Sequence, residues 1–303
     1  MSWDLDELGD LSAHTYLVTG ANSGIGLETA RELVARGAHV LLGCRDVAKG
    51  ERARADIAGR GTATVLEMDL SDLDSVRAAA AKVDRLDALV CNAGVMGGHY
   101  MLTAQGFERQ MGTNHLGHAD LVTSLWPQLS AAGGRVVLVS SIAARGGRLT
   151  PETSAADLMG PERYISQSTY RDTKQANLLF AMELHRRSAA AGSPVTAVAC
   201  HPGVSSTNLF ARNQSDSGRP WLAPVASVLG AVALQSARAG ALPTLRALAP
   251  TTPSGSFVGP RAFGQVRGAP HLLDVYPSGA NLRTAARLWD LTEELLGRPL
   301  PLG

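Results

Sequence analysis

The 303-residue sequence lacks a cysteine framework and an excess of either charge. Its three cysteines, Cys44, Cys91 and Cys200, cannot all pair and show no C-x-x-C spacing, so we expect reduced thiols, no disulfides and no metal site. The 28 basic and 27 acidic side chains leave a net charge of +1. This balance argues against nucleic acid or an anionic membrane as the main partner, because both attract a basic surface.

We also expect neither a signal peptide nor a membrane span. The first ten residues carry four acidic side chains, the reverse of the basic start of a signal peptide. The longest apolar stretch, residues 222–234, contains Pro224 and is shorter than the ~20 residues of a membrane helix. We therefore expect a cytoplasmic protein, and we interpret residues 222–234 as a buried helix or a lid.

The pattern of apolar residues predicts an α/β fold. From residue 15 to about residue 198, short β-branched or Leu-rich runs alternate with Ala/Arg/Leu stretches of helical period, which is typical of repeated βαβ units. We predict a Rossmann-type doubly wound parallel sheet of about seven strands with helices on both faces. Strands are expected near 16–18, 39–42, 64–68, 88–91, 135–139 and 195–199. Helices are expected near 25–36, 47–58, 73–82, 104–131, 169–191, 225–249 and 282–296.

The expected organisation is one domain, residues 1–303, with a variable substrate lobe around residues 204–250. Two stretches rich in Gly, Ser, Pro and Arg, residues 143–168 and 204–224, are expected to be long loops. Loops of that length in a compact domain are usually functional.

A glycine-rich turn follows the first expected strand and precedes a helix. Glycines let the backbone turn sharply and approach a pyrophosphate, whose charge then lies at the helix N-terminus. Such glycines arise by chance roughly 0.36 times in so glycine-rich a chain, but the flanking strand and helix support the interpretation. We predict that the turn binds a dinucleotide through Gly20, Asn22, Ser23, Gly24, Ile25 and Gly26.

The end of the second expected strand favours NADP (NADPH) over NAD. An Asp or Glu there normally holds a free 2′-hydroxyl of the adenine ribose, whereas a 2′-phosphate calls for Arg. Here uncharged Cys44 takes the acidic position and Arg45 follows it. The alternative is that Arg45 is a solvated loop residue and that Asp46, placed to cap the next helix, supplies the acid for NAD.

Tyr170 and Lys174 are four residues apart at the start of a helix, so they share one face. A phenol is a poor acid or base at pH 7, and a nearby ammonium lowers its pKa. Tyr170 could then exchange a proton with a carbonyl or alcohol oxygen. A chance Tyr-x-x-x-Lys is expected only roughly 0.05 times, so this motif is more informative than the glycines; the bland alternative is an exposed tyrosine with an unrelated lysine.

Lysine is rare, since 25 of the 28 basic residues are arginines. Where either cation serves, this composition would supply arginine about nine times in ten. A lysine at position 174 therefore indicates a constraint from chemistry, because a compact ammonium cannot be replaced by a planar guanidinium. The other two lysines, Lys49 and Lys82, are assigned to helix surfaces.

These residues resemble the short-chain dehydrogenase/reductase family over nearly the whole chain. The family's landmarks occur in order: Thr19 to Gly26, Asp69, Cys91 to Gly94, Asn114, Ser140-Ser141, Tyr170 to Lys174, and His201-Pro202-Gly203 with Thr207. Three further patterns are similar to the retinol-dehydrogenase-like branch: 43–46, 114–118 and 174–177.

The resemblance implies a catalytic set of Asn114, Ser141, Tyr170 and Lys174. Ser141 would hydrogen-bond the substrate carbonyl oxygen. Tyr170 would be the acid in reduction and the base in oxidation. Lys174 would lower the pKa of Tyr170 and hold the nicotinamide ribose. Asn114 would organise a water that links Lys174 to solvent.

The resemblance also implies the contacts to the dinucleotide. Asp69 would meet the adenine amino group, and Leu70 would lie beside it. The remaining contacts would come from Asn92, Ala93, Gly94, Pro202, Gly203, Val204 and Thr207, the last four beside the nicotinamide.

Some residues near the motifs are left without a catalytic role. Ser140 and Ser141 are adjacent on an extended segment and point to opposite sides, so only one can face the substrate, and the resemblance favours Ser141. Cys91 stands where the family usually has asparagine and suits a buried strand end. The histidines beside the motifs, His115, His118 and His201, are interpreted as packed or solvated side chains and not as ligands.

The part of the chain beyond Gly203 is expected to set the substrate. A lid over an apolar substrate is predicted from Leu209, Phe210, Trp221, Leu222, Val225, Val228 and Leu229, with a plain core helix as the alternative. Arg145 and Arg148 border the same mouth and could meet an anionic substrate.

The sequence therefore predicts an NADP-dependent oxidoreductase that interconverts a carbonyl and an alcohol on a lipophilic small molecule. One alternative is reduction of an activated C=C bond, and another is a dinucleotide sensor or scaffold without turnover. The complete catalytic set speaks against the sensor. The substrate, the physiological direction and the formation of a homo-oligomer are left open.

Overall fold

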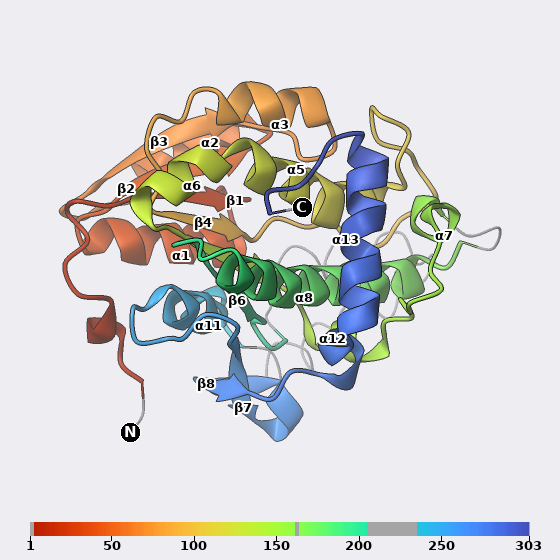
Figure 1. Ribbon diagram of the computed structural model, residues 1–303. Coiled ribbons are helices and arrows are strands. Elements are labelled where there is room, and N and C mark those ends of the chain that lie inside the picture. Colours follow the sequence, from red (N-terminus) through yellow and green to blue (C-terminus); the bar gives the residue numbers. More distant parts are fainter. Residues whose placement is uncertain (1–2, 161–163, 205–234, 303) are drawn as a thin grey trace, which may run out of the picture.

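The computed structural model describes residues 3–160, 164–204 and 235–302 (Figure 1). Within them, one sheet has eight strands in the order β3-β2-β1-β4-β5-β6-β7-β8. Its parallel strands are β1 (Thr15–Thr19), β2 (His39–Cys44), β3 (Thr62–Glu67), β4 (Ala88–Cys91), β5 (Arg135–Val139), β6 (Thr196–Cys200) and β7 (Phe257–Ala262). The last strand, β8 (Arg267–Leu273), is antiparallel to β7. The predicted doubly wound parallel sheet is confirmed, with one antiparallel edge strand added.

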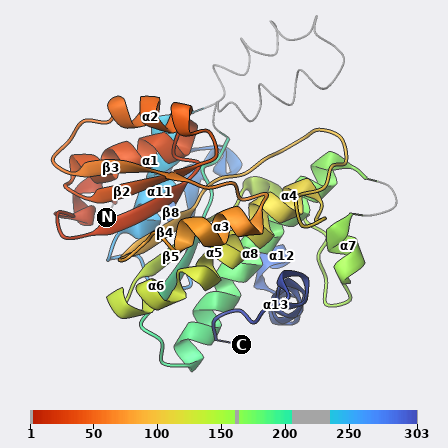
Figure 2. The same cartoon turned by 90° about the horizontal axis from the view of Figure 1, so that it is seen from above.

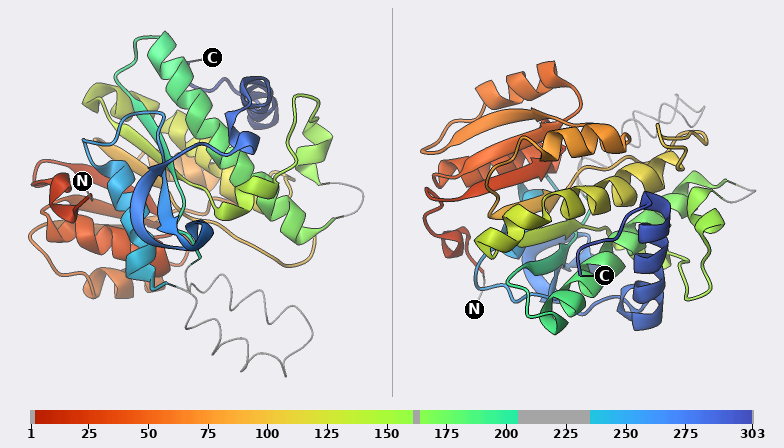
Figure 3. Two further views of the ribbon diagram at one scale, coloured as in Figure 1. Left: turned by 90° about the horizontal axis from the view of Figure 1, so that it is seen from below. Right: turned by 45° about the horizontal axis from the view of Figure 1, so that its top comes forward.

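Two apolar cores lie on the two faces of the sheet. On one face, α1 (Gly24–Ala35) and α11 (Ala237–Leu248) pack through Leu33, Val34 and Leu245. The other face is covered by α3 (Leu73–Ala80), α5 (Gly117–Ser124) and the long α8 (Ser166–Ala190). α2 (Val47–Ala55) packs on β2 and β3, and α13 (Leu282–Leu296) packs across α8 (Figures 2 and 3). The inner strands β1, β4, β5 and β6 are buried on both faces, which explains why they are continuous apolar runs in the sequence.

The predicted helix over 104–131 is the largest difference between prediction and structure. The segment forms α4 (Arg109–Met111), a π-helical turn (Gly112–Leu116), α5 and α6 (Trp126–Ala132). Pro127 lies in the first turn of α6, where a proline is tolerated and where it ends the preceding helix. The π turn widens the helix at Asn114, a feature that often marks a functional site.

The expected loops contain short helices. A 3₁₀ turn (Ile142–Gly146) and α7 (Ala155–Met159) lie within 143–168, and α12 (Pro277–Ala280) precedes α13. Of the helix expected over 225–249, the described part is α11, and residues 205–234, with the expected lid, lie outside the described residues. The three cysteines are buried and free. In the described ranges, every helix is too short or too polar to cross a bilayer.

Candidate active site

Two adjoining cavities open where the strand order reverses between β1 and β4, at the carboxyl ends of the parallel strands. This is the crevice at which open α/β sheets bind ligands. The larger cavity has a volume of about 430 Å³ and the smaller about 270 Å³. They share the residues of the glycine-rich turn and of the loop after β4: Gly20, Asn22, Ser23, Ala93 and Gly94. Through these shared residues the two cavities form one continuous trough along the glycine-rich turn.

The turn between β1 and α1 requires glycine at Gly20, Gly24 and Gly26, the second because its φ is +57°. Gly20 has φ +67°, a left-handed conformation that favours glycine. A Cβ on Gly26 would lie 2.6 Å from both Asn92 Nδ2 and Gly20 O. Ser23, the residue before α1, makes no side-chain capping bond, so the N–H groups of the first turn are left to a ligand. The residues present therefore fit a pyrophosphate.

Charged side chains gather at the smaller cavity. Asp46 caps α2 by accepting from Lys49 N at 2.9 Å, and it pairs with Lys49 Nζ at 2.8 Å. The Arg45 side chain is 72% exposed and lies 3.5 Å from Asp69 Oδ2. As expected, Lys49 is exposed on helix α2, and it also lines the cavity beside Arg45.

Two more expected contacts lie in the smaller cavity. Asp69 accepts from Ser71 N at 2.9 Å and from Ser71 Oγ at 2.6 Å through Oδ1, which fixes the turn before α3. Leu70 lines the cavity beside it. Cys44 lies there as well, and burial raises the pKa of its thiol to about 11, so it is neutral at pH 7.

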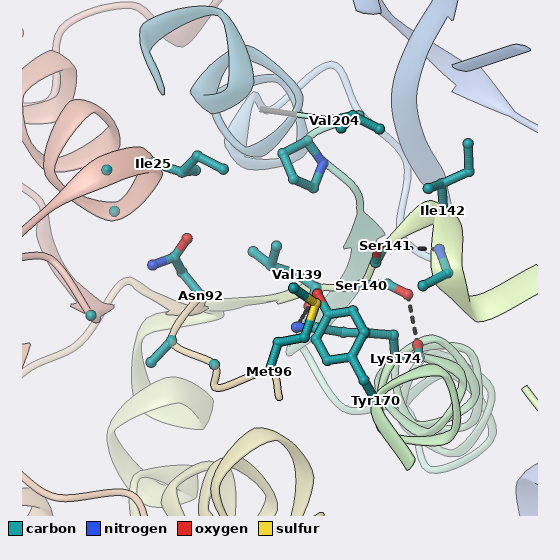
Figure 4. Close-up of a pocket in the computed structure, with 18 of the residues that line it drawn as sticks. Ile25, Asn92, Met96, Val139, Ser140, Ser141, Ile142, Tyr170, Lys174 and Val204 are labelled. Atoms are coloured by element: carbon teal, nitrogen blue, oxygen red, sulfur yellow. Dashed lines mark hydrogen bonds between the residues drawn. The ribbon is translucent and has the colours of Figure 1, made fainter. Parts of the chain in front are cut away.

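Tyr170 and Lys174 point from α8 into the larger cavity (Figure 4). Both are buried, and Lys174 Nζ donates to Val139 O at 3.0 Å. The nitrogen lies 5.8 Å from the centre of the Tyr170 ring. The spacing of four residues thus brings both side chains to one site, as predicted.

The two adjacent serines take different directions. Ser140 is buried and its Oγ donates to Lys174 O at 2.7 Å, which attaches β5 to α8. Ser141 Oγ accepts from Ala143 N at 3.1 Å and bonds the side chain of Tyr170. The structure therefore places Ser141, the serine favoured by sequence, beside the phenol.

Burial dominates the protonation of the pair. It raises the pKa of Tyr170 to about 12, and the hydrogen bond with Ser141 opposes the shift. It lowers the pKa of Lys174 to about 8, which the Cys200 thiol opposes. The effect of Lys174 on the pKa of Tyr170 stays a prediction, because burial and the Ser141 hydrogen bond are the two causes of the shift found in the structure. The phenol is neutral at pH 7 and can donate a proton.

Asn114 ties the cofactor side of the cavity to α8. It is fully buried in the π turn, and its Oδ1 accepts from Val95 N at 2.7 Å. Its Nδ2 donates to Val95 O at 2.9 Å and to Thr173 Oγ1 at 3.0 Å. A Cβ on Gly94 would lie 3.3 Å from Asn114 Oδ1 and 3.5 Å from Lys174 Nζ, so a glycine keeps this space open.

The remaining expected residues lie where they were predicted, with one exception outside the described ranges. Asn92, Pro202, Gly203 and Val204 line the larger cavity, and Thr207 falls among residues 205–234. The sequence interpretation missed five lining residues: Met96, Val139, Ile142, Ala143 and Gln167. Gln167 precedes Tyr170 by three residues on α8, a helical spacing that could have revealed it.

The two arginines expected at the mouth are engaged elsewhere. Arg148 forms an ion pair with the buried carboxylate of Asp172 at 2.5 Å. Arg145 lies over the Tyr276 ring, 4.7 Å from its centre. Neither lines the larger cavity in the described part of the chain, so the structure gives the anionic substrate no support.

Comparisons with known proteins agree with this geometry. The model of the short chain dehydrogenase family matches residues 14–156. Human retinol dehydrogenase 12 is 39% identical over 298 residues, which cover 95% of this chain and 87% of that protein. An uncharacterized protein from Mycobacterium paratuberculosis, of known crystal structure, is 41% identical with a TM-score of 0.82, covering 99% of this chain and all of that one.

A more distant structure contains a dinucleotide. A protein described as an NAD(P)-dependent gluconate 5-dehydrogenase from Beutenbergia cavernae, with NADP bound at low occupancy, is 25% identical with a TM-score of 0.61. The match covers 79% of this chain and 91% of that chain.

Fold and cavities together define a dinucleotide-binding α/β oxidoreductase. The chain belongs to the short-chain dehydrogenase/reductase family, in its retinol-dehydrogenase-like branch. It is an NAD(P)-dependent oxidoreductase that acts on CH–OH groups.

Proposed function

We propose that the protein interconverts a carbonyl and an alcohol on a lipophilic small molecule, with NADP as the dinucleotide and Tyr170 as general acid and base. The observation that carries the proposal is the meeting of Tyr170, Ser141 and Lys174 in the cavity onto which the glycine-rich turn opens. The bound dinucleotide supplies or accepts the hydride. The chain supplies the binding, the orientation and the proton.

The proton chemistry follows from the environment of Tyr170. Its phenol is neutral at pH 7, since burial raises a pKa that is already well above 7 to about 12, so in reduction it holds the proton that the substrate oxygen takes up. Ser141 bonds Tyr170 and can donate to the same oxygen as negative charge develops there. Oxidation is the reverse transfer: Tyr170 takes the alcohol proton as the phenolate, so the phenol must first release its own proton to solvent.

Lys174 and Asn114 support that transfer. The Lys174 ammonium, with a pKa of about 8, faces the space beside Gly94 where the nicotinamide ribose would lie. Asn114 holds the π turn, the loop after β4 and α8 together through its bonds to Val95 and Thr173. These contacts fix the distance between Lys174 and the reacting oxygen.

Charge at the smaller cavity favours the 2′-phosphate of NADP. Asp46 is already occupied by the α2 N-terminus and by Lys49, which weakens it as an acceptor for a ribose hydroxyl. The exposed guanidinium of Arg45 makes only a long contact with Asp69 and can turn to a phosphate. NADP is also the dinucleotide in the Beutenbergia cavernae protein.

The lining of the larger cavity favours a lipophilic substrate. Met96, Ile142, Val139 and Val204 present apolar surface near Tyr170 (Figure 4). A retinoid alcohol, the substrate named for human retinol dehydrogenase 12, is of this class. Apolar lining with a few converging polar groups is typical of small-molecule sites.

A spectrophotometric scan tests the proposal. NADPH and NADH oxidation is followed at one wavelength over a panel of long-chain aldehydes, ring ketones and enones. We expect NADPH-dependent reduction of lipophilic aldehydes or ketones. Turnover of enones alone would replace the proposal with C=C reduction, and NADPH binding without any turnover would replace it with a sensor.

A further inference from the structure

A buried hydroxyl connects the dinucleotide turn to the loop after β4. Thr19, the last residue of β1, is fully buried, and its Oγ1 accepts from Asn92 N and Ala93 N at 2.9 Å each. The same oxygen lies 2.9 Å from His118 Nε2 and 3.2 Å from Val90 O. Both lone pairs of the hydroxyl are therefore used, and it has one proton to donate.

This arrangement fixes the tautomer of His118. Its Nδ1 lies 2.9 Å from the backbone oxygen of Asn114, which can only accept, so Nδ1 carries the proton. His118 is fully buried, and burial lowers its pKa to about 4, so the ring is neutral and Nε2 is bare at pH 7. Nε2 then accepts from the Thr19 hydroxyl, the shorter of the two contacts open to that proton.

We propose that His118 is a positioning residue that couples the dinucleotide turn to the catalytic π turn through Thr19 and Asn114. The His118 ring contacts both turns, one through each of its nitrogens. Nε2 fixes the hydroxyl that orders the Asn92 and Ala93 amides at the cofactor cavity. Nδ1 fixes the backbone of Asn114, whose side chain reaches α8 one residue before Lys174.

The neighbouring histidine provides a matched control. His115 is also buried, and burial lowers its pKa to about 3. Its Nε2 bonds Thr292 Oγ1 on α13 at 2.9 Å, and its ring meets Phe180 edge to face. It thus has the same burial, in the π turn that leads directly into α5, but it contacts α13 and lines neither cavity in the described part of the chain. Substitution there is expected to cost stability alone.

Two amide substitutions separate the two ends of the His118 ring. Asparagine carries its side-chain N–H near the position of Nδ1, and glutamine carries an amide group near Nε2. His118→Asn keeps the bond to Asn114 O and loses Thr19, whereas His118→Gln keeps a partner for Thr19 and loses Asn114. The readouts are the NADPH dissociation constant from nicotinamide fluorescence, kcat with the best substrate of the panel, and Tm.

The expected result is a split between binding and turnover. His118→Asn raises the NADPH dissociation constant about tenfold with kcat nearly unchanged, and His118→Gln lowers kcat about tenfold with nearly normal NADPH binding. His115→Asn and His115→Gln lower Tm and leave both constants as in the wild type. The inference is overturned if the His118 and His115 variants behave alike, or if both His118 variants change the two constants in parallel.

The inference rests on the proposed function for its kcat readout, and the two can fail separately. If the wild-type protein turns over no carbonyl, the proposed function fails. The NADPH dissociation constant is then the readout that tests the role of His118. Equal dissociation constants for the wild type and His118→Asn would overturn the coupling role.

Discussion

The two halves of the dinucleotide trough differ in how the chain controls charge. In the larger cavity the ionisable groups, Tyr170 and Lys174, are buried, and burial is the main cause that raises the pKa of Tyr170 to about 12 and lowers that of Lys174 to about 8. In the smaller cavity Arg45, Asp46 and Lys49 are exposed and act as full charges screened by water. We therefore assign proton transfer to the buried cavity, where Tyr170 and Lys174 each have a separate role. We assign the choice between NADP and NAD to the exposed cavity, where Arg45, Asp46 and Lys49 act together on the adenine ribose.

Tyr170→Phe tests whether the buried cavity carries out the proton transfer, and it is expected to have the largest effect. The phenol is the only group that we assign to proton transfer, so its loss is expected to lower kcat by about 10²- to 10⁴-fold. NADPH binding should stay within about twofold, because the ring and its packing remain. The measurement is steady-state reduction of the best panel substrate together with fluorescence titration of NADPH. Retained turnover would remove Tyr170 as the acid.

A second test uses the burial of Lys174. Its pKa is lowered from 10.5 to about 8, so the unfolded chain binds this proton more readily than the folded one. As pH falls from about 10.5 to about 8, wild-type stability should drop relative to Lys174→Met by about 3 kcal/mol, and the gap should stay constant below pH 8. Urea unfolding of both proteins across this range measures the gap. The lost bond to Val139 adds a pH-independent offset, so a flat difference would contradict the buried charge.

Much of the fold could be predicted from the sequence, and the failures have a physical cause. The inner strands β1, β2, β4, β5 and β6 could be predicted because a strand largely buried on both faces is an apolar run, and the edge strand β3 because it is rich in β-branched residues. The edge pair β7 and β8 was missed because Pro260 and Pro270, which lie opposite each other, are typical of turns in a sequence pattern. The π turn at Asn114 was missed because one wider turn does not change an apolar spacing visibly.

In the candidate site, too, some residues could be predicted from local sequence and others could not. Tyr170 and Lys174 could be predicted because their spacing along one helix is local. Lys49 and His118 could not, since their roles come from contacts made only in the fold: His118 meets Thr19 across 99 residues of chain. Both halves of the trough thus contain residues whose roles depend on the fold, and the two remaining tests address the exposed half.

Arg45→Ala tests whether the exposed half selects the dinucleotide. A guanidinium that meets a 2′-phosphate contributes only with NADPH, so its loss should raise the KM for NADPH about tenfold and leave the KM for NADH nearly unchanged. Arg52→Ala is the matched control, because Arg52 is exposed on α2 and does not line the cavity. An equal rise in KM for NADPH and NADH would show that Arg45 does not bind the 2′-phosphate.

Lys49→Ala is expected to give the smallest change in KM, and it separates the effect of the Lys49 charge from that of its partner Asp46. Lys49 pairs with Asp46 and lines the cavity, so its removal deletes one cation and also frees one carboxylate. The freed Asp46 repels a 2′-phosphate and can accept from a ribose hydroxyl, so the KM for NADPH should rise about threefold while the KM for NADH falls slightly. Raising the salt concentration should reduce the change in the KM for NADPH, since both charges are exposed.

The double variant Lys49→Ala with Asp46→Asn also lacks the cation, but it removes the carboxylate charge that Lys49→Ala leaves unpaired. If that variant matches Lys49→Ala, the carboxylate is irrelevant, and Lys49 acts on the cofactor only through its own charge.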